Sequence, residues 1–213
     1  MRVTVFDYGA GNLHSLAKAL AAPGIEVAIE SDACRALVTD ALVLPGVGAF
    51  AAAAERLAPG RDAMRAALAT GLPCLGICLG MQLLFESSEE GAGAGIGVLA
   101  GRVERLRARR VPQIGWNAIE EPRDALFARG DLTLAYFANG FVCRPETEAA
   151  VTAWSRHEDD RFAAAVRKGR TVGVQFHPEK SSHPGVRFLQ SWLVEAAGQA
   201  AAPVAMPGQE PGR

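Results

Sequence analysis

The stretch LPCLGICLGMQ, residues 72–82, decides the fold of this chain. Residues 72–77 form a short apolar run that predicts a buried strand, and the apolar positions Leu79, Leu83, Leu84 and Phe85 predict an amphipathic helix after it. A strand that leads directly into a helix is the unit from which parallel sheets with helices on both faces are built. The turn between them has the pattern Gly-x-Cys-x-Gly.

This turn resembles the elbow that presents a nucleophile, with sulfur in place of oxygen. Such a turn is sharp and strained, so side chains two residues before and after Cys78 would collide. The elbow places the thiol at the carboxyl edge of the sheet and at a helix N-terminus, whose partial positive charge favours the thiolate. The backbone N–H of Leu79 points to where an attacked carbonyl develops negative charge. The alternative is a buried cysteine in an ordinary turn.

Strand-like and helical segments alternate through the first half of the chain and again near residues 172–193. The pattern predicts strands at residues 2–6, 25–29, 41–44 and 172–176, and helices at residues 13–20, 49–57, 62–70 and 186–193. Residues 98–154 carry short strand-like runs broken by Gly, Pro and Asn. We therefore expect an α/β fold, a mostly parallel sheet with helices on both faces and an appended antiparallel β region. Residues 1–197 are expected to form one domain, and residues 198–213 a disordered tail.

His177-Pro178-Glu179 follows the last predicted strand and supplies a base and a carboxylate. Pro178 disfavours helical backbone for His177, so the histidine should be extended at the end of its strand. Residues two apart in an extended chain share a side, whereas a bend would require the contact to be made across the turn. A carboxylate fixes the imidazole tautomer and stabilises the imidazolium. Cys78, His177 and Glu179 are the predicted catalytic residues; a surface turn is the alternative.

The loop LPGVG, residues 44–48, ends the third predicted strand. Its glycines leave backbone N–H groups accessible, and the loop should reach the same edge of the sheet as Cys78. We interpret Val47 and Gly48, with Leu79, as the oxyanion donors. A tight strand-to-helix turn without a catalytic role is the alternative.

The bulk composition excludes several classes of protein. A formal net charge of -1 argues against a dedicated nucleic-acid or membrane-surface binder. No apolar run is long enough to span a bilayer, and the N-terminus turns polar at Asp7, so a cytoplasmic location is expected. The histidines lack clustered partners, so no metal site is expected.

Other signals receive ordinary interpretations. The cysteines have no framework spacing, so reduced thiols are expected, with Cys34, Cys74 and Cys143 in the core. The arginine-rich residues 102–110 are interpreted as a solvated hairpin. Gly-x-Gly at residues 9–11 is only part of a dinucleotide fingerprint.

With these elements together, the sequence resembles the class I glutamine amidotransferases over residues 1–195. It is similar to one branch in particular, the glutaminase subunits of imidazole glycerol phosphate synthase. The branch motifs are DYGAGNL at residues 7–13, GWN at 115–117 and PEKSS at 178–182. The resemblance implies a flavodoxin-like α/β fold. It also implies hydrolysis of glutamine to glutamate and ammonia through a cysteine thioester, with no cofactor and no metal.

The same resemblance implies roles for residues outside the triad. Gln82 and Glu90 match the positions that hold the substrate glutamine, and Glu90 would pair with its α-ammonium. Gly140 and Phe141 can also bind the substrate if backbone groups make the contacts. Glu89 is an adjacent alternative carboxylate, and a helix-surface location is the ordinary alternative for these side chains.

The resemblance further implies a partner, a (βα)8-barrel cyclase subunit. That partner uses the ammonia to make imidazole glycerol phosphate and an aminoimidazole carboxamide ribonucleotide in histidine biosynthesis. Asn12, Trp116 and Lys180 match the interface positions, and a solvated loop charge is the alternative for Lys180.

The sequence departs from the family at two places. Gln113 stands where the family often has a histidine, and Asn139-Gly140-Phe141 replaces its usual His-Ser/Thr-Tyr. Because the triad is intact, we expect altered glutamine affinity or activation rather than lost chemistry. Two alternatives stay open: another cysteine hydrolase, peptidase-like or γ-glutamyl-cleaving, and an inactive regulatory module.

Overall fold

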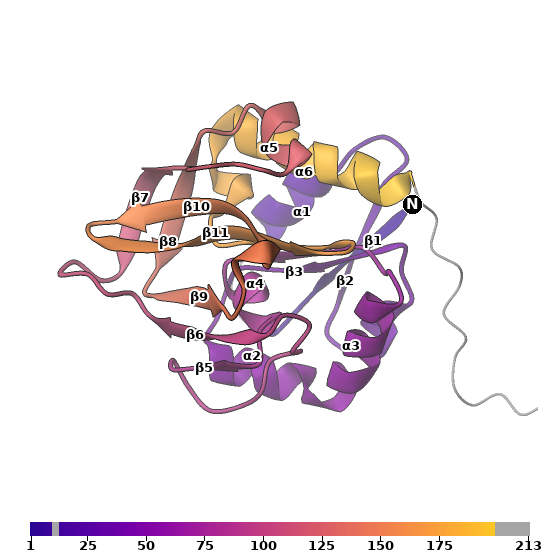
Figure 1. Cartoon of the computed structure of the whole chain (residues 1–213). Coiled ribbons are helices and arrows are strands. Elements are labelled where there is room, and N and C mark those ends of the chain that lie inside the picture. Colours follow the sequence, from indigo (N-terminus) through magenta and orange to yellow (C-terminus); the bar gives the residue numbers. More distant parts are fainter. Residues whose placement is uncertain (10–12, 199–213) are drawn as a thin grey trace, which may run out of the picture.

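The computed structural model describes residues 1–9 and 13–198 and has an α/β architecture (Figure 1). Its main sheet has seven strands in the order β10-β11-β12-β4-β3-β1-β2. The parallel strands are β1 Arg2–Phe6, β2 Glu26–Glu30, β3 Ala41–Leu44, β4 Cys74–Ile77 and β12 Thr171–Val174. The antiparallel strands β11 Asp160–Lys168 and β10 Val151–His157 extend it at one edge. The predicted fold class is confirmed.

Helices cover both faces of the sheet, as Figure 1 shows. One face carries α1 His14–Leu20, α5 Ala125–Gly130 and α6 Ser182–Ala197. The other carries α2 Phe50–Leu57, α3 Arg61–Ala69 and α4 Leu79–Leu83. Short 3-10 turns lie at Arg35–Leu37, Ala58–Gly60, Glu148–Ala150 and Pro178–Lys180. Each face has its own hydrophobic core, so the alternating side chains of the strands are buried on both sides.

The helix after Cys78 differs from the prediction. Instead of an amphipathic helix, α4 is five residues long and buried throughout. It packs against β4, β3, β12, β9 and α2, so no side is left for solvent. Leu84 and Phe85 lie beyond its end and are also fully buried. A helix buried on all sides is a core helix, which explains why its residues are apolar except for Gln82.

The predicted antiparallel region is confirmed but is divided between sheets. One sheet contains β5 Ser87–Ser88, β6 Gly101–Arg105 and β9 Phe141–Pro145, and β7 Gln113–Ala118 pairs with β8 Leu134–Asn139 in another. Because β6 and β7 belong to different sheets, the interpretation of residues 102–110 as a hairpin is wrong. The region also contains α5, whose first turn is capped by the Asp124 carboxylate accepting from Leu126 N at 3.0 Å.

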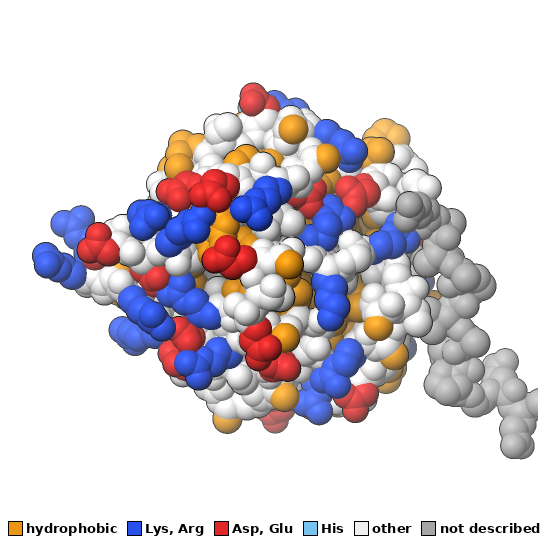
Figure 2. Space-filling view, viewed as in Figure 1, with side chains coloured by type: hydrophobic (Ala, Val, Ile, Leu, Met, Phe, Trp, Pro, Cys, Tyr) orange, Lys and Arg blue, Asp and Glu red, His pale blue; other side chains and the backbone are white. Residues whose placement is uncertain are grey.

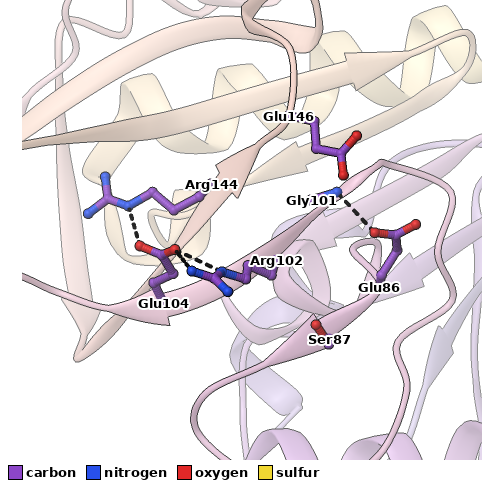
Figure 3. Close-up of a pocket in the computed structure, with 7 residues that line it drawn as sticks. All are labelled: Glu86, Ser87, Gly101, Arg102, Glu104, Arg144 and Glu146. Carbon is purple, nitrogen blue, oxygen red and sulfur yellow. Dashed lines mark hydrogen bonds and ion pairs between the residues drawn. The ribbon is translucent and has the colours of Figure 1, made fainter.

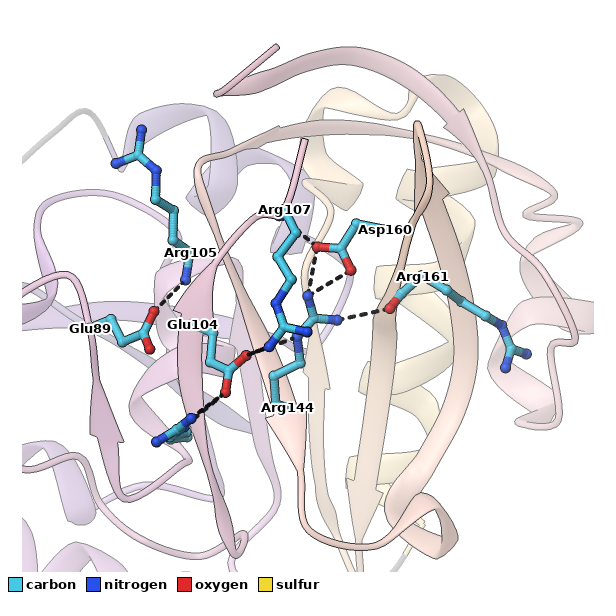
Figure 4. A network of polar contacts seen from close by, with 8 residues as sticks. Glu89, Glu104, Arg105, Arg107, Arg144, Asp160 and Arg161 are labelled. Atoms are coloured by element: carbon cyan, nitrogen blue, oxygen red, sulfur yellow. Dashed lines mark hydrogen bonds and ion pairs between the residues drawn. The ribbon is translucent and has the colours of Figure 1, made fainter. Parts of the chain in front are cut away.

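Buried ion pairs join the smaller sheet to the main one (Figure 4). Arg144 of β9 donates from Nη2 to both carboxylate oxygens of Asp160, at 2.7 and 2.6 Å. Arg144 Nε lies 3.6 Å from Glu104 of β6, and Arg107 Nη2 donates to the same carboxylate at 2.6 Å. Both carboxylates are buried, so the guanidinium groups are their necessary partners.

In the part of the chain that the structure describes, no helix is long and apolar enough to cross a membrane. Asn12 and residues 199–213 of the predicted tail lie outside the described residues.

Replacing Arg144 by alanine should leave the buried carboxylates of Asp160 and Glu104 without their shared partner. We expect the free energy of unfolding to fall by about 3 kcal/mol, because removing one member of a buried pair leaves the other uncompensated. Urea denaturation measures the change. Arg35→Ala, which removes the exposed pair with Glu30, is the control and should change stability by less than about 1 kcal/mol. Equal losses in the free energy of unfolding of the two variants would contradict the inference that the buried ion pairs of Arg144 stabilise the fold more than the exposed pair of Arg35.

Candidate active site

Cys78 lies in the strained turn between β4 and α4. Its backbone has φ 46° and ψ -102°, a conformation that non-glycine residues rarely adopt. Its N–H donates to Val174 O of the neighbouring strand at 2.7 Å. A Cβ on Gly76 would lie 2.6 Å from Gly80 O, and one on Gly80 would lie 1.9 Å from Leu44 O. The predicted steric need for both glycines is confirmed.

His177 connects the thiol to a carboxylate. Its backbone is extended, with φ -101° and ψ 95°, as the following proline predicts. Pro178–Lys180 then forms a 3-10 turn, and His177 Nδ1 lies 2.8 Å from Glu179 Oε1, so the contact is made across the bend. The imidazole also lies beside Cys78, since a Cβ added to Gly46 would lie within 3.0 Å of His177 Cε1 and of Cys78 Cβ. The structure therefore brings the three predicted catalytic side chains into one connected row.

The neighbours of His177 decide its protonation. Burial alone would lower its pKa, but hydrogen bonds and charge interactions with Cys78 and Glu179 outweigh burial and raise the pKa to about 9. The site thus favours an imidazolium at neutral pH, next to the Cys78 sulfur. An imidazolium in this place can act as an acid toward a leaving group.

A serine that the sequence did not single out for this role holds the histidine backbone. Ser181 Oγ donates to His177 O at 2.7 Å and accepts from Tyr136 N at 2.9 Å. His177 N in turn donates to Tyr136 O at 2.8 Å. Strand β8 is therefore joined to residues 177–181 by two hydrogen bonds, and the third holds that turn together. In the sequence, the position of Ser181 in the branch motif at residues 178–182 is the only indication of this role.

The loop after β3 reaches the thiol, as predicted. A Cβ added to Gly46 would lie 2.8 Å from His177 Cε1 and 3.0 Å from Cys78 Cβ. This glycine is therefore required by close approach to both catalytic side chains. Val47 packs against the core that contains Cys78, and Gly48 has φ 108°. Leu79 begins α4 directly after the nucleophile. The oxyanion role of these residues stays a prediction.

The predicted substrate residues lie around this site in different ways. Gln82 is buried, and its Nε2 donates to Phe141 O at 3.2 Å. The Glu90 carboxylate accepts from Phe50 N at 3.1 Å, at the start of α2 and two residues beyond Gly48. Glu90 is thus the carboxylate beside the Val47–Gly48 loop.

Its alternative, Glu89, lies elsewhere and accepts from Arg105 N at 3.0 Å (Figure 4). The segment that contains Gly140 and Phe141 passes beside the sulfur, since Cys78 Sγ lies 4.0 Å from Ala138 O.

The two family departures meet in space. Gln113 and Asn139 are directly opposite each other in the β7–β8 register. Both side chains are buried, and the amide oxygen of each lacks a hydrogen-bond partner among the described residues. The two expected departures therefore lie at one place in the structure, next to the strand segment that passes Cys78.

The remaining cysteines lie in environments that differ from that of Cys78. Cys74 and Cys143 are buried as predicted, and burial raises the pKa of both thiols, which keeps them protonated. Cys34 is exposed, so its prediction as a core residue is wrong. It lies on the turn that begins the 3-10 segment Arg35–Leu37, where the apolar neighbours Ala33 and Ala36 point inward instead.

Other surface features do not compete with this site. A hollow of about 370 Å³ beside β6 and β9 is lined by Arg102 and Arg144, which pair with Glu104, and by none of Cys78, His177 and Glu179 (Figure 3). Figure 2 shows basic and acidic side chains intermingled over the face in view. Within residues 1–9 and 13–198, no group of three or more His, Cys, Asp or Glu is placed to hold a metal ion.

Comparison with known proteins identifies the family to which the chain belongs. The family model for glutamine amidotransferase class-I matches residues 4–196. The chain therefore belongs to the class I glutamine amidotransferases.

Among curated relatives, it is similar to "Imidazole glycerol phosphate synthase subunit HisH" of Leifsonia xyli subsp. xyli. The two are 43% identical over 203 residues, which cover 90% of this chain and 97% of the relative. The protein of the same name from Symbiobacterium thermophilum is 45% identical, with 90% and 92% covered. The resemblance to this branch is confirmed.

A solved glutamine amidotransferase has the same fold, with a TM-score of 0.70 at 24% identity and coverage of 92% of this chain and 99% of that one.

Glu179→Gln should lower the pKa of His177, because the variant removes the negative charge beside Nδ1. The wild-type pKa of about 9 lies above the ordinary value of 6.5. The interaction therefore stabilises the fold fully below pH 6.5, and this stability is lost as pH rises through 9. NMR titration of the imidazole, with denaturation from pH 6 to 10, measures both effects. Resonances of the other histidines should match in the two proteins. An unchanged pKa of His177 would contradict the carboxylate's role.

Proposed function

We propose that this chain is the glutaminase subunit of an imidazole glycerol phosphate synthase, with residues 1–197 as its domain. The observation that carries the proposal is the row of Cys78, His177 and Glu179 at a strained strand-to-helix turn. The names of the curated relatives support glutamine as the substrate class over a peptide or another γ-glutamyl compound. The complete triad argues against an inactive regulatory module.

The proposed reaction follows from the positions of these groups. The Cys78 thiolate attacks the side-chain carboxamide carbon of glutamine, and the backbone N–H groups of Leu79 and the Val47–Gly48 loop stabilise the oxyanion. The His177 imidazolium gives its proton to the departing nitrogen, which leaves as ammonia. The resulting thioester is hydrolysed by a water that His177, now neutral, activates as a base. Glutamate leaves and the thiolate–imidazolium pair is restored.

The partner in this proposal is a (βα)8-barrel cyclase that receives the ammonia and makes imidazole glycerol phosphate and the aminoimidazole carboxamide ribonucleotide. An exposed apolar face on the β7–β8 ribbon supports docking beside the triad. Ile114, Trp116 and Leu134 are 69%, 48% and 48% exposed, and Trp116 packs edge-on against Tyr136. The Tyr136 backbone is the one that contacts His177. Gln82, Glu90, Gly140 and Phe141 are assigned to glutamine, and Asn12 to the interface by resemblance alone.

Cys78→Ala should abolish ammonia release from glutamine, because the thioester can no longer form. The change removes one sulfur from a position where alanine fits, so the fold should be retained by circular dichroism. Ammonia is measured with and without the cyclase subunit and its nucleotide ligand, and the wild type should be slow alone and strongly stimulated in the complex. Retained glutaminase activity in the variant would remove Cys78 as nucleophile. Full turnover by the isolated wild type would contradict the partner.

Lys180→Ala should weaken docking or let ammonia leak, with triad chemistry spared. Lys180 is exposed directly after the triad glutamate, and none of the salt bridges among the described residues includes it. Its ammonium is therefore available to a partner carboxylate, a contact for which we expect a loss of about tenfold in affinity. Titration calorimetry against the cyclase subunit measures this. Arg187→Ala, on α6, is the control and should bind normally. Unchanged affinity and unchanged coupling in Lys180→Ala would exclude it from the interface.

A further inference from the structure

A buried amide contacts the nucleophilic sulfur beside the triad. Gln175 follows β12 and is fully buried, with 0% exposure, in an otherwise apolar segment. Its Nε2 lies 3.4 Å from Cys78 Sγ, within the range of an N–H···S hydrogen bond. A buried polar group in an apolar strand is costly unless it is fully paired, so its presence needs a reason.

The surroundings determine which end of this amide faces the sulfur. Gln82 Nε2 donates to Phe141 O at 3.2 Å, and a backbone carbonyl can only accept. The same Nε2 lies 3.4 Å from Gln175 Oε1. The donor end of Gln82 therefore faces the oxygen of Gln175, which leaves the Gln175 NH₂ group directed at Cys78. The chain of hydrogen bonds fixes an orientation that an isolated amide would leave open.

We propose that Gln175 is a further residue of the active site, which donates a hydrogen bond to the Cys78 thiolate and holds it for attack. This inference rests on the proposed glutaminase function only for the identity of the reaction. An amide suits the task because it stabilises negative charge on sulfur without being able to take the proton. The proton thus stays with His177, where the leaving nitrogen needs it. The hydrogen bond is strongest to the thiolate and weakens once the neutral thioester forms.

The same chain of hydrogen bonds reaches residues 139–141, where the sequence is expected to depart from its family. Phe141 O accepts from Gln82 Nε2 and also from Asn139 Nδ2, the latter at 3.1 Å. Asn139 ends β8, the strand whose Tyr136 backbone contacts His177. A shift of this segment would therefore move Gln82 and Gln175 and change the hydrogen bond to the sulfur. Gln175 is a positioning residue through which this segment acts on the nucleophile.

Alkylation of Cys78 tests the inference without requiring turnover. The full chain carries Cys34→Ser, because Cys34 is exposed and would also react. Iodoacetamide modification of the Cys78 peptide is followed by mass spectrometry from pH 5 to 10. Gln175→Met keeps the side-chain length but has no N–H. It should move the midpoint of the rate profile upward by about one pH unit and slow alkylation about tenfold at low pH. Gln175→Glu, which is isosteric and gains a negative charge, should move the midpoint further.

Thr171→Val is the matched control. Thr171 is a buried polar residue of β12, and its Oγ1 has no hydrogen-bond partner among the described residues. It should leave the midpoint unchanged, which separates loss of the sulfur contact from general disturbance of the strand.

A midpoint in folded Gln175→Met or Gln175→Glu equal to that of Thr171→Val would overturn the inference. Glutaminase activity of the complex is measured in parallel. A shifted midpoint together with an inactive wild-type complex would refute the proposed function and leave the Gln175 contact standing.

Discussion

The structure depends on one strained residue, Cys78, held in a conformation that its own side chain disfavours. The strain persists because β4 and α4 are packed on both sides of it and because Gly76 and Gly80 let the turn close against Leu44. The same turn places the thiol at a helix start and at the edge of the sheet, so packing energy is used to present a nucleophile.

The parallel sheet then gathers the other groups at that edge. Strands β3, β4 and β12 are adjacent and parallel, so the loops after them end side by side. The first brings Gly46, the second Cys78, and the third Gln175 and His177. This convergence is the general reason why open α/β sheets bind ligands beyond the carboxyl ends of their strands. Here it also brings two different partners to the sulfur, a titratable imidazole and a neutral amide.

The antiparallel additions connect this site to the outside. Tyr136 and Ser181 fix β8 to the His177 backbone, and the ion pairs of Arg144 fix β9 to the main sheet. An exposed apolar ribbon face therefore stands on a strand that contacts the triad through its backbone. Trp116 packs against Tyr136, whose backbone oxygen accepts from His177 N, so a short series of contacts joins this surface to the histidine.

The sequence by itself determined the elbow, the parallel strands around it and the extended His177 at a strand end, because these follow from local patterns of glycine, proline and alternating apolar residues. The tertiary structure alone decided the rest. It buried α4 on all sides, exposed Cys34, set Gln113 against Asn139 and turned the amide of Gln175 toward the sulfur. Each of these depends on residues far apart in the chain, and a hydrogen bond or a buried face between distant segments leaves no period in the sequence.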